Sequence, residues 1–415
     1  MTAFPSAVDV AVIGAGAAGI AAGRRLAEAG VVSVLMLEGR DRAGGRAWTV
    51  EREGLPLDLG GEWLHSADRN MLTPLAERLG FAINRQRPDW TTRLRHSGES
   101  AAAEADWLSE REAHYWAIHR AAREPEDRPA SSVLQPGGRW NALFDATSTW
   151  ANAVELEHLS VKDNDRYEDS GINWRVVRGY GTLVQALAEG LPIAFNTKVS
   201  RVEHRGKRLV LDTSRGRVSA ERAIVAVPTA VLACEDLAFD PALPRKFDAA
   251  NGLPLGLADK LFFAFDGEDV PERFLVGSTR QRETMSYQVR PFGRPRINCF
   301  FGGAFAAALE REGIEAMAAF ATDELAGLLG ADVRRRLRPL AASFWRRDEF
   351  ARGSYSYARP GHADDRAALA SPVDGRIFFA GEACSLNYFS TVHGAYDTGI
   401  TAAEAALDSL KGAAA

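Results

Sequence analysis

The chain has 415 residues, of which 46% are hydrophobic and 25% charged, and its formal net charge is -5 at pH 7. A chain of this length exceeds one ordinary core, which predicts a globular protein of about two domains. The slightly acidic balance provides no basic field for a polyanion and argues against nucleic acid as a partner.

Targeting and cysteine signals favour the cytoplasm. The apolar stretch Val8–Ile20 lacks a preceding basic residue and is interrupted by glycine, which is atypical of a signal peptide. We find no run of about 20 apolar residues that predicts a membrane span, and no C-terminal anchor or peroxisomal signal. Cys234, Cys299 and Cys384 have neither metal-ligand nor redox-pair spacing, which predicts free thiols and no metal site. We expect a cytoplasmic monomer or homodimer without membrane contact.

The N-terminal segment predicts a βαβ unit. Val8–Gly14 has the apolar pattern of a buried parallel strand, Ala17–Ala29 that of a helix, and Val31–Leu37 that of the next strand. A connection of this kind places both strands in one sheet with the helix on its face.

The middle of the chain predicts helices first and two groups of strands afterwards. The pattern is helical from about Asn70 to Glu124, including Ala102–Arg123, and a Pro-rich, charged surface loop follows at Pro125–Gly138. The remaining elements are a helix, three strands, three further strands, a long helix, a short strand and an Ala-rich helix. They are expected at Gly181–Leu191, Thr197–Glu203, Lys207–Asp212, Arg222–Val227, Leu257–Phe265, Met285–Val289, Arg296–Phe301, Phe305–Leu329, Arg376–Ala380 and Gly394–Leu410.

The turn after the first strand reads GAGAAG and matches GxGxxG at the start of a helix. In this pattern Gly14 permits the tight turn, Gly16 lets the backbone approach a pyrophosphate, and Gly19 packs the helix on the strand. Glu38 ends the second strand, where a carboxylate accepts hydrogen bonds from a ribose. A glycine-rich turn without a ligand is the alternative, and the unit does not separate NAD from FAD. The expected contacts are Gly14, Gly16, Ala17, Ala18, Gly19 and Glu38.

Five further segments resemble a known family. Glu38–Arg46, EGRDRAGGR, is similar to the ExRxRxGGR segment of FAD-containing glutathione-reductase-like oxidases, and Asp58–His65, DLGGEWLH, to the LGxxWxH segment of amine and polyamine oxidases. FAGEA at Phe379–Ala383 and STVHGA at Ser390–Ala395 resemble the C-terminal FAD motif of that family. Trp174–Pro228, with VVRGYGTLVQALAEGL and AIVAVP, looks like the polyamine oxidase and histone demethylase branch. The whole length thus resembles a flavin amine oxidase.

The resemblance implies the fold and the cofactor. It implies an α/β, Rossmann-type, glutathione-reductase-like FAD domain from residues 1–69, 179–250 and 345–415, and an α+β substrate domain of mixed sheet and helices from 70–178 and 251–344. Val202 is assigned to the adenine and Glu382 to the ribityl chain, and a helix from near Thr391 would point at the flavin pyrimidine. The further implied contacts are Gly39, Arg40, Gly45, Arg46, Gly60, Gly61, Glu62, Trp63, Gly381 and Val392.

Lys260 interrupts an otherwise apolar strand, LADKLFF at Leu257–Phe263. A lysine in such surroundings is costly without a purpose. The matching lysine of amine oxidases holds a water near the flavin N5 atom, and the resemblance assigns that role to Lys260. An edge-strand lysine turned to solvent is the alternative.

Aromatic residues near the C-terminus match the spacing of an amine cage. GSYSY at Gly353–Tyr357 corresponds to the segment in which monoamine oxidases place the cysteine that links the flavin, and Ser354 stands at that position, which implies a non-covalent FAD. Tyr355 matches a cage tyrosine and Trp345 a tryptophan beside the flavin, although a core role for Trp345 is equally consistent. Thr391 replaces the second cage tyrosine, a pattern similar to that of polyamine oxidases and flavin demethylases.

Polar candidates complete the predicted site. His65 matches the histidine of animal-type polyamine oxidases, with a simple backbone hydrogen bond as its alternative role. Distal ammonium groups of a substrate would need carboxylates, although solvated surface acids are more common than such a role. The candidates are Glu62, Glu155, Asp163 and Asp165.

The predicted activity is oxidation of a C–N bond in a primary, secondary or polyamine-type substrate. The imine would be hydrolysed to an aldehyde or ketone, with O2 reduced to hydrogen peroxide. A flavin desaturase of the protoporphyrinogen or carotenoid type is one alternative, against which Lys260 and Tyr355 argue. A flavin-binding scaffold without chemistry is another. Histone demethylation is disfavoured because the chain lacks room for the helical modules of chromatin targeting.

Overall fold

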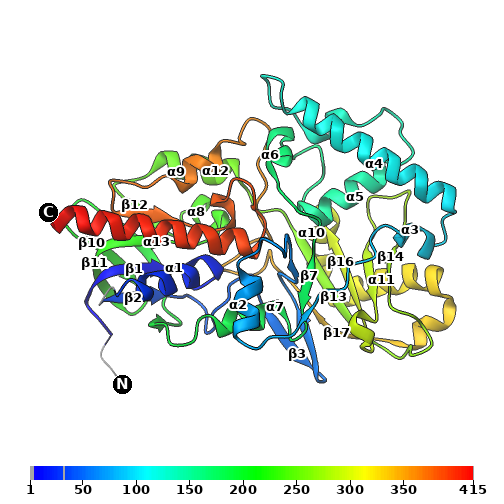
Figure 1. The fold of residues 1–415 in the computed structure, drawn as a ribbon, viewed down its shortest axis with the longest axis horizontal. Coiled ribbons are helices and arrows are strands. Elements are labelled where there is room, and N and C mark those ends of the chain that lie inside the picture. The colour runs from blue at the N-terminus through cyan, green and yellow to red at the C-terminus, as the bar shows by residue number, and fades with distance from the viewer. Residues whose placement is uncertain (1–3, 31–32, 415) are drawn as a thin grey trace.

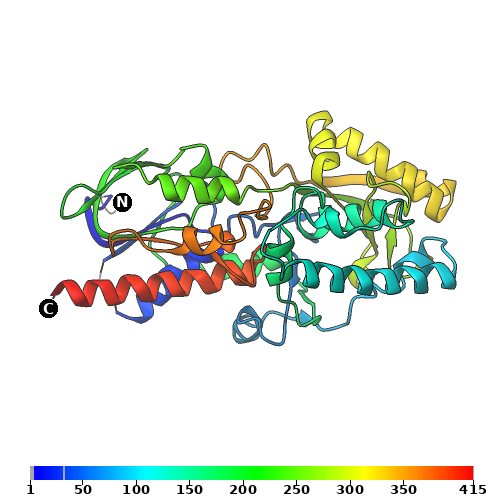
Figure 2. The ribbon, with the colours of Figure 1, turned by 90° about the horizontal axis from the view of Figure 1, so that it is seen from above.

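Two sheets, each with its own helices, divide the molecule into two lobes (Figure 1). The computed structural model describes residues 4–30 and 33–414. One lobe carries both chain ends, and the long helix α13 runs along it, whereas α4, α5, α10 and α11 surround the other (Figures 1 and 2).

The first lobe is built on an eight-stranded sheet of order β12-β9-β10-β11-β1-β2-β8, with β18 paired to the second half of β11. β2, β1, β11 and β18 run parallel, so their carboxyl ends meet at one edge. The bounds are β1 (Ala7–Ile13), β2 (Val34–Leu37), β8 (Ile193–Ala194), β9 (Val199–Glu203), β10 (Leu209–Thr213), β11 (Gly216–Val225), β12 (Ala238–Asp240) and β18 (Ile377–Phe379).

Helices cover both faces of this sheet because its central strand is apolar on both sides. In β1, Val10 and Val12 join the core under α1 (Ala17–Glu28) and α13 (Val392–Ala414). Ala11 and Ile13 point to the other face, where they join the core of the remaining helices. Those helices are α8 (Thr229–Ala233), α9 (Pro244–Gly252) and α12 (Asp365–Ala370).

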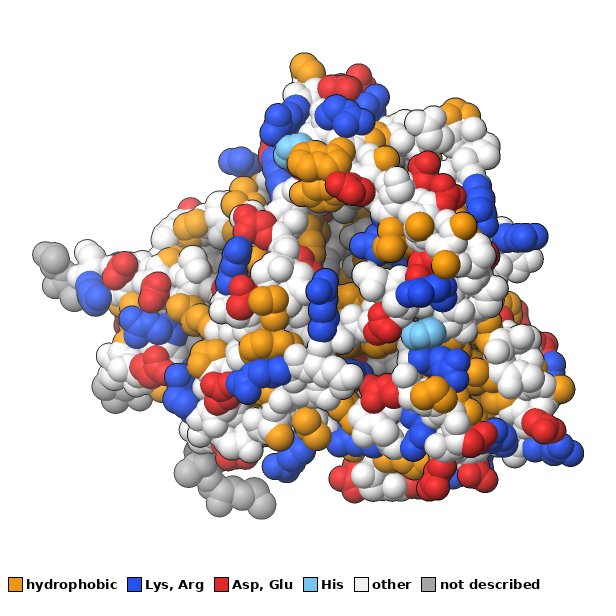
Figure 3. Space-filling model, turned by 45° about the vertical axis from the view of Figure 1, so that its right-hand side comes forward, with side chains coloured by type: hydrophobic (Ala, Val, Ile, Leu, Met, Phe, Trp, Pro, Cys, Tyr) orange, Lys and Arg blue, Asp and Glu red, His pale blue; other side chains and the backbone are white. Residues whose placement is uncertain are grey.

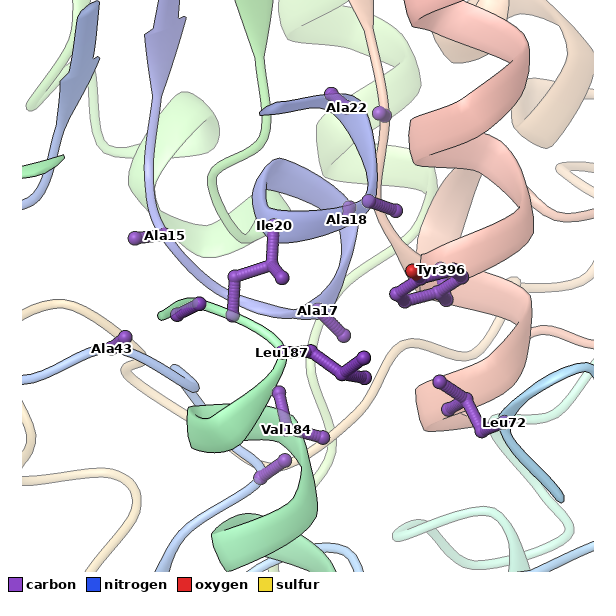
Figure 4. Packing of buried hydrophobic residues seen from close by; sticks show 14 of the residues in the cluster. Ala15, Ala17, Ala18, Ile20, Ala22, Ala43, Leu72, Val184, Leu187 and Tyr396 are labelled. Atoms are coloured by element: carbon purple, nitrogen blue, oxygen red, sulfur yellow. The ribbon is translucent and has the colours of Figure 1, made fainter. Parts of the chain in front are cut away.

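The close packing of α1 depends on small side chains. Figure 4 shows Ala17 and Ala18 of α1 facing Tyr396 of α13, while Ile20 points toward Val184. Val184 belongs to α7 (Tyr180–Ala186), so three segments far apart in sequence share one core. This packing fixes the N-terminal ends of α1 and α13 relative to the sheet edge.

The second lobe is an antiparallel five-stranded sheet of order β14-β15-β16-β13-β17. Its strands are β13 (Ala258–Phe265), β14 (Arg273–Val276), β15 (Ser286–Val289), β16 (Arg296–Gly302) and β17 (Leu337–Ala342). Its helices are α3 (Arg93–His96), α4 (Ala101–Ala121), α5 (Asn141–Ala151), α6 (Val161–Arg166), α10 (Gly303–Glu312) and α11 (Ile314–Leu329).

The remaining elements are short. They are β3 (Thr49–Arg52), β4 (Leu55–Asp58), β5 (Trp63–Leu64), β6 (Ile83–Asn84), β7 (Trp174–Val176), α2 (Leu72–Arg78) and 3-10 turns at Ala130–Val133, Pro291–Gly293, Ala331–Arg335 and Glu382–Cys384. Asp58, at the end of β4, accepts a hydrogen bond from the Tyr180 backbone N–H at 2.9 Å and so anchors the start of α7.

The predicted βαβ unit and both groups of strands are confirmed, with differences in detail. Val31 and Val32, at the start of the second predicted strand, lie outside the described residues. The helix expected over Phe305–Leu329 is two helices, because Gly313 with φ of 100° breaks it. β14, β17 and the β3–β4 hairpin were not predicted, and the loop at Pro125–Gly138 contains a 3-10 turn.

The surface carries no large field of one sign on the face shown in Figure 3, where basic and acidic side chains are interspersed. Within the described residues, no helix has the length and apolar character needed to cross a membrane.

Candidate functional site

One cavity of about 610 Å³ begins at the carboxyl edge of the parallel strands and extends into the second lobe. Gly14 and Glu38 line it where β1 and β2 end, and Lys260 of β13 and Phe300 of β16 line it from the other sheet. A cavity at this edge of a parallel sheet is the usual place for a nucleotide.

Glu38 organises the nucleotide end through its two carboxylate oxygens. Oε2 accepts the Ala15 N–H at 2.7 Å, and Oε1 accepts the Arg40 N–H at 2.9 Å. The carboxylate is 4% exposed and lies within 3.9 Å of the Arg40 guanidinium. The turn after β1 and the segment after β2 are therefore held by one acid whose remaining lone pairs can accept from ribose hydroxyls.

Glycines form part of the cavity wall and bring the backbone close to neighbouring segments. Gly60 and Gly61 form the stretch called the glycine wall below. Gly14 has φ of 98°, and a Cβ there would lie 2.7 Å from the Ala226 carbonyl oxygen. A Cβ on Gly60 would lie 1.7 Å from the Arg46 carbonyl oxygen, and one on Gly61 would lie 2.6 Å from a Val392 methyl. Only glycine permits these approaches, so the wall leaves room for a flat, extended ligand.

Two helices direct their N-terminal ends at the cavity. Gly16 and Ala17 at the start of α1 line it, as does Val392 at the start of α13. The first N–H groups of a helix have no intrahelical acceptor and carry a partial positive charge, which suits phosphate at α1 and an electron-rich ring at α13. Thr391 caps α13, because its hydroxyl accepts the Gly394 N–H at 2.9 Å and donates to the Tyr388 carbonyl at 2.6 Å.

An ion pair joins the two FAD-like segments. Arg46 Nη1 lies 3.0 Å from a Glu382 carboxylate oxygen and donates to the Ser354 carbonyl at 2.7 Å. Burial alone would raise the pKa of Glu382, but Arg46 and the Ser356 hydroxyl at 2.6 Å outweigh it, so the pKa lies below its ordinary value. Glu382 is therefore a fixed negative charge beside the cavity.

These features fit FAD. The acid at the end of β2, the positive φ at Gly14, the two helix N-termini and the glycine-walled passage offer acceptors for ribose, donors for phosphate and space for a ring system. Glu38, the α1 N-terminus, Arg46 and the Gly60–Gly61 segment are the chain's groups that would hold it.

Lys260 is buried at 7% exposure and fully paired. Its ammonium donates to the Asp58 carbonyl at 3.0 Å, the Gly60 carbonyl at 2.9 Å and Glu62 Oε2 at 2.8 Å. Burial would raise the pKa of Glu62, but Lys260 and then Arg175, 3.8 Å away, hold it below its ordinary value. Lys260 thus joins β13 of one lobe to the glycine wall of the other, and the edge-strand alternative is excluded.

One hydrogen bond orients the His65 ring. Its Nδ1 lies 2.6 Å from the Asn173 side-chain oxygen, an acceptor, so in the neutral ring the N–H lies on Nδ1 and Nε2 is an acceptor. Burial lowers the pKa of His65, against the opposing effects of Asp169 and Asn173. His65 and Asp169 both line the cavity.

The predicted aromatic residues lie in the same cavity. The Tyr355 hydroxyl donates to the Trp150 carbonyl at 2.6 Å, and burial raises its pKa well above the ordinary value. Trp345 Nε1 donates to the Leu59 carbonyl at 3.1 Å. The Ser354 hydroxyl bonds the Ala258 N–H and C=O at 2.8 and 2.7 Å, so it locks β13 to the Tyr355 segment.

The structure brings nearly all predicted positions to this one cavity. The lining residues from the predicted set are Gly14, Gly16, Ala17, Ala18, Glu38, Gly39, Arg40, Gly45, Arg46, Gly60, Gly61, Glu62, Trp63, His65, Lys260, Trp345, Tyr355, Gly381, Glu382, Thr391 and Val392. Gly19 does not line the cavity. A Cβ at this position would lie 1.9 Å from the Gly14 carbonyl oxygen, so the lack of a side chain at Gly19 permits the helix to pack on the strand.

Val202, predicted to contact the adenine, does not line the cavity and requires correction. It is fully buried in β9 and pairs with Leu211 and Phe239 on the neighbouring strands. Val199 of the same strand lines the cavity instead. Both valines are buried in the same core, and the pairing of β9 with β10 is irregular between Asp212 and Thr213, so regular alternation does not hold between Val199 and Val202.

The distal carboxylates are also corrected. Asp163 forms a fully buried ion pair with Arg366 at 2.6 Å, Glu155 accepts the Ala304 N–H at 2.7 Å, and Asp165 pairs with His119 at 2.8 Å. None of the three acids lines the cavity. Asp163 thus joins α6 of the second lobe to α12 of the first, and Glu62 is committed to Lys260.

Several lining residues were missed because only the fold brings them there. At the substrate end the polar ones include Arg93, Thr147, Asn152, Tyr167, Asp169 and Asn298, and the large apolar ones include Trp90, Trp150 and Phe274. They come from α3, α5, β14, β16 and the loops between them, and no local motif marks them. In the part of the chain that the structure describes, no group of His, Cys, Asp and Glu is arranged to hold a metal.

Comparisons with known proteins agree with this geometry. A family model described as flavin containing amine oxidoreductase matches residues 17–97 and 84–407. Polyamine oxidase 2 of Arabidopsis thaliana is 32% identical over 95% of this chain and 87% of its own length. Lysine-specific histone demethylase 1 homolog 2 of Oryza sativa subsp. japonica is 30% identical over 97% of this chain but only 57% of its own length.

A solved structure shows the same fold. Wild-type putrescine oxidase bound to putrescine superimposes with a TM-score of 0.79 at 22% identity, covering 97% of this chain and 99% of that one.

Proposed function

We propose that this chain, which belongs to the flavin-containing amine oxidoreductases, is an FAD-dependent amine oxidase that cleaves a C–N bond of a small amine with O2 as acceptor. The substrate is a primary, secondary or polyamine-type amine. One observation carries this proposal: a single cavity joins the dinucleotide cradle to Lys260, His65 and Tyr355.

Overall, a hydride equivalent leaves the substrate α-carbon and a proton leaves its nitrogen, giving an imine. Water converts the imine to an aldehyde or ketone and a shorter amine or ammonia. The two electrons and two protons reach O2 as hydrogen peroxide. FAD, when bound, supplies the two-electron acceptor, and the protein supplies binding, orientation and charge.

His65 is suited to manage the amine proton. An amine reaches the protein mainly as a cation, and only its neutral form has the lone pair needed for oxidation. The unprotonated Nε2 of His65 can accept that proton, while the bond from Nδ1 to Asn173 keeps the ring oriented. Asp169 beside it can stabilise the imidazolium that results.

Lys260 and Tyr355 shape the reacting end. Lys260 holds the Asp58 and Gly60 carbonyls and Glu62 in one arrangement, which fixes the glycine wall. Its three N–H donors are all matched by protein oxygens, so any water that it holds must share one of them. Tyr355 is fixed through the Trp150 carbonyl and offers an aromatic face to an amine.

The activity test measures the consumption of O2 and the formation of two products for each amine. Purified protein loaded with FAD is mixed with a panel of amines in air, and O2 consumption, hydrogen peroxide and carbonyl product are measured together. We expect all three in a ratio of about one for at least one amine. Amine consumption without peroxide would show a different acceptor and overturn the oxidase part of the proposal.

We further propose that the protein is cytoplasmic and a monomer or homodimer. The cysteines Cys234, Cys299 and Cys384 are free, as suits a reducing compartment. Sedimentation equilibrium of the holoprotein tests the assembly state, and a tetramer would contradict it.

A further inference from the structure

One end of the cavity is lined by polar side chains with unsatisfied atoms. Among the described residues, Arg93 Nε, Thr147 Oγ1, Trp150 Nε1 and Asn298 Oδ1 are buried and have no hydrogen-bond partner, and all four side chains line the cavity. Buried donors and acceptors normally have partners, so a group of unmatched atoms around one space indicates a missing ligand.

Arg93 is the central member of this group. It is 9% exposed, and its Nε is buried and has no hydrogen-bond partner within residues 4–30 and 33–414. Burial and the neighbouring Arg111 lower its pKa to about 10, which leaves it charged near neutral pH. A buried guanidinium without a counter-ion is rare because the desolvation of its charge is not compensated.

The fold holds Arg93 in place from behind. The Ser97 hydroxyl donates to the Arg93 carbonyl at 2.7 Å and accepts the Val276 N–H at 2.8 Å, which fixes α3 against β14. The Arg93 guanidinium carbon lies 5.5 Å from the centre of the Trp150 ring. Thr147 lies three residues before Trp150 on α5, so both side chains share one face of that helix.

This group adjoins the reacting end of the cavity. The Trp150 carbonyl accepts the Tyr355 hydroxyl at 2.6 Å, so a single tryptophan separates Tyr355 from Arg93. A substrate whose nitrogen lies beside Tyr355 therefore reaches Arg93 with its other end.

The acids of the cavity do not provide a second site for a cation at that end. Glu62 is paired with Lys260, Glu382 with Arg46, and Glu38 with backbone N–H groups. Asp236 and Glu349, which also line the cavity, are paired with Arg352 and Lys198. Asp169 is the acid beside His65, where the amine is expected. The Arg93 end offers a guanidinium, an indole N–H and a hydroxyl as donors for an anionic oxygen, beside the unmatched amide oxygen of Asn298, which is an acceptor.

We propose that Arg93, Thr147 and Trp150 form a carboxylate subsite, so that the substrate is an amine carrying a carboxylate at its other end. This proposal rests on the amine oxidase function proposed above and names the substrate class of the same cavity. A diamine or polyamine would place its second cation against Arg93, and the repulsion would disfavour it.

The test compares three amines of equal chain length on the holoenzyme: butylamine, 1,4-diaminobutane and 4-aminobutanoate. We expect kcat/KM to rank 4-aminobutanoate first and 1,4-diaminobutane last. Arg93→Met should lower kcat/KM for 4-aminobutanoate roughly 10- to 100-fold, mainly through KM, as expected for loss of hydrogen bonds to a charged group. The same variant should improve 1,4-diaminobutane, a reversal that a merely structural role of Arg93 would not produce.

Control variants distinguish the effect of the Arg93 charge on substrate preference from a general effect on folding. Arg93→Lys keeps the charge and should retain part of the preference for 4-aminobutanoate. Arg87→Met removes an exposed arginine that does not line the cavity and should leave all three substrates unchanged. An equal loss on all three amines in Arg93→Met, or an unaltered preference, would overturn the carboxylate subsite. Equal use of 4-aminobutanamide would do the same, because it would show a neutral acceptor.

Binding provides a readout that does not depend on turnover. Butanoate, which has no amine to oxidise, is titrated into the holoenzyme and followed by calorimetry. Binding to the parent and its loss in Arg93→Met support the subsite even if none of the amines is oxidised, in which case only the proposed function fails. Oxidation of amines together with no butanoate binding in the parent would overturn the subsite alone.

Discussion

Replacing Lys260 by methionine removes the side-chain hydrogen bonds that join β13 to the Asp58 and Gly60 carbonyls and to Glu62. The variant loses three hydrogen bonds and leaves the buried carboxylate of Glu62 with only Arg175 at 3.8 Å. Breaking a buried ion pair by removing one partner typically costs about 3 to 5 kcal/mol. Because Arg175 remains, we expect a loss of about 3 kcal/mol in the free energy of unfolding, with FAD still bound.

The same change should slow the chemistry. Loss of the hold on Gly60 lets the cavity wall shift, and a displacement of about 1 Å can cost on the order of 100-fold in rate. Stopped-flow measurement times the anaerobic reduction by amine and the reoxidation by O2 separately. A defect only with O2 assigns Lys260 to reoxidation, and one only in the anaerobic reaction assigns it to amine oxidation.

Three variants separate these effects. Lys260→Met combined with Glu62→Gln should recover about 1 to 3 kcal/mol relative to Lys260→Met, because no uncompensated carboxylate remains. Lys260→Arg keeps the charge but changes its geometry. Lys246→Met, which removes a buried lysine bonded to the Ala368 and Leu369 carbonyls away from the cavity, should destabilise the fold without slowing either half-reaction. Strictly additive stabilities in the double variant, or unchanged half-reactions in Lys260→Met, would refute the reasoning.

Three further outcomes are expected. Glu38→Gln should weaken FAD binding by roughly 1 to 3 kcal/mol, because a charge-assisted acceptor is lost, and equal flavin retention on dilution would contradict it. Acid precipitation should release the yellow cofactor into the supernatant, since Ser354 offers no thiol, and colour in the pellet would show a covalent link. Burial and Glu310 raise the pKa of Asp259 in the folded protein, so the native state holds a proton that the unfolded state releases, and stability should fall as pH rises from about 5 to about 8. Urea unfolding should show this slope flattened in Asp259→Asn, and an unchanged slope would exclude Asp259 as its source.

Local motifs were sufficient to predict that Gly14, Gly16 and Glu38 line one end of the cavity. Gly14, Gly16 and Glu38 act within one βαβ unit, whose geometry follows from strand, turn and helix alone. The apolar pattern of β9 did not show which of its two valines reaches the cavity: both are buried in the same core, but Val199 lines the cavity and Val202 does not.

The substrate end depends on tertiary structure. Arg93 stands on a four-residue helix without a recognisable motif, and the role proposed for it rests on a buried Nε that has no hydrogen-bond partner among the described residues. Asp163 had the character of a surface acid or a ligand, yet Arg366, some 200 residues away in sequence, buries it in an ion pair. Such pairings across long separations are invisible to periodicity and spacing.

Anaerobic reduction of the bound flavin tests the central claim most directly. Holoenzyme is mixed without O2 with amines that include 4-aminobutanoate, 1,4-diaminobutane and butylamine, and the visible absorbance of oxidised flavin is followed. The account predicts bleaching by at least one amine, with one carbonyl product formed per flavin and full recovery of the absorbance on admission of O2. A flavin that dithionite bleaches but that amines of every class leave oxidised would contradict it.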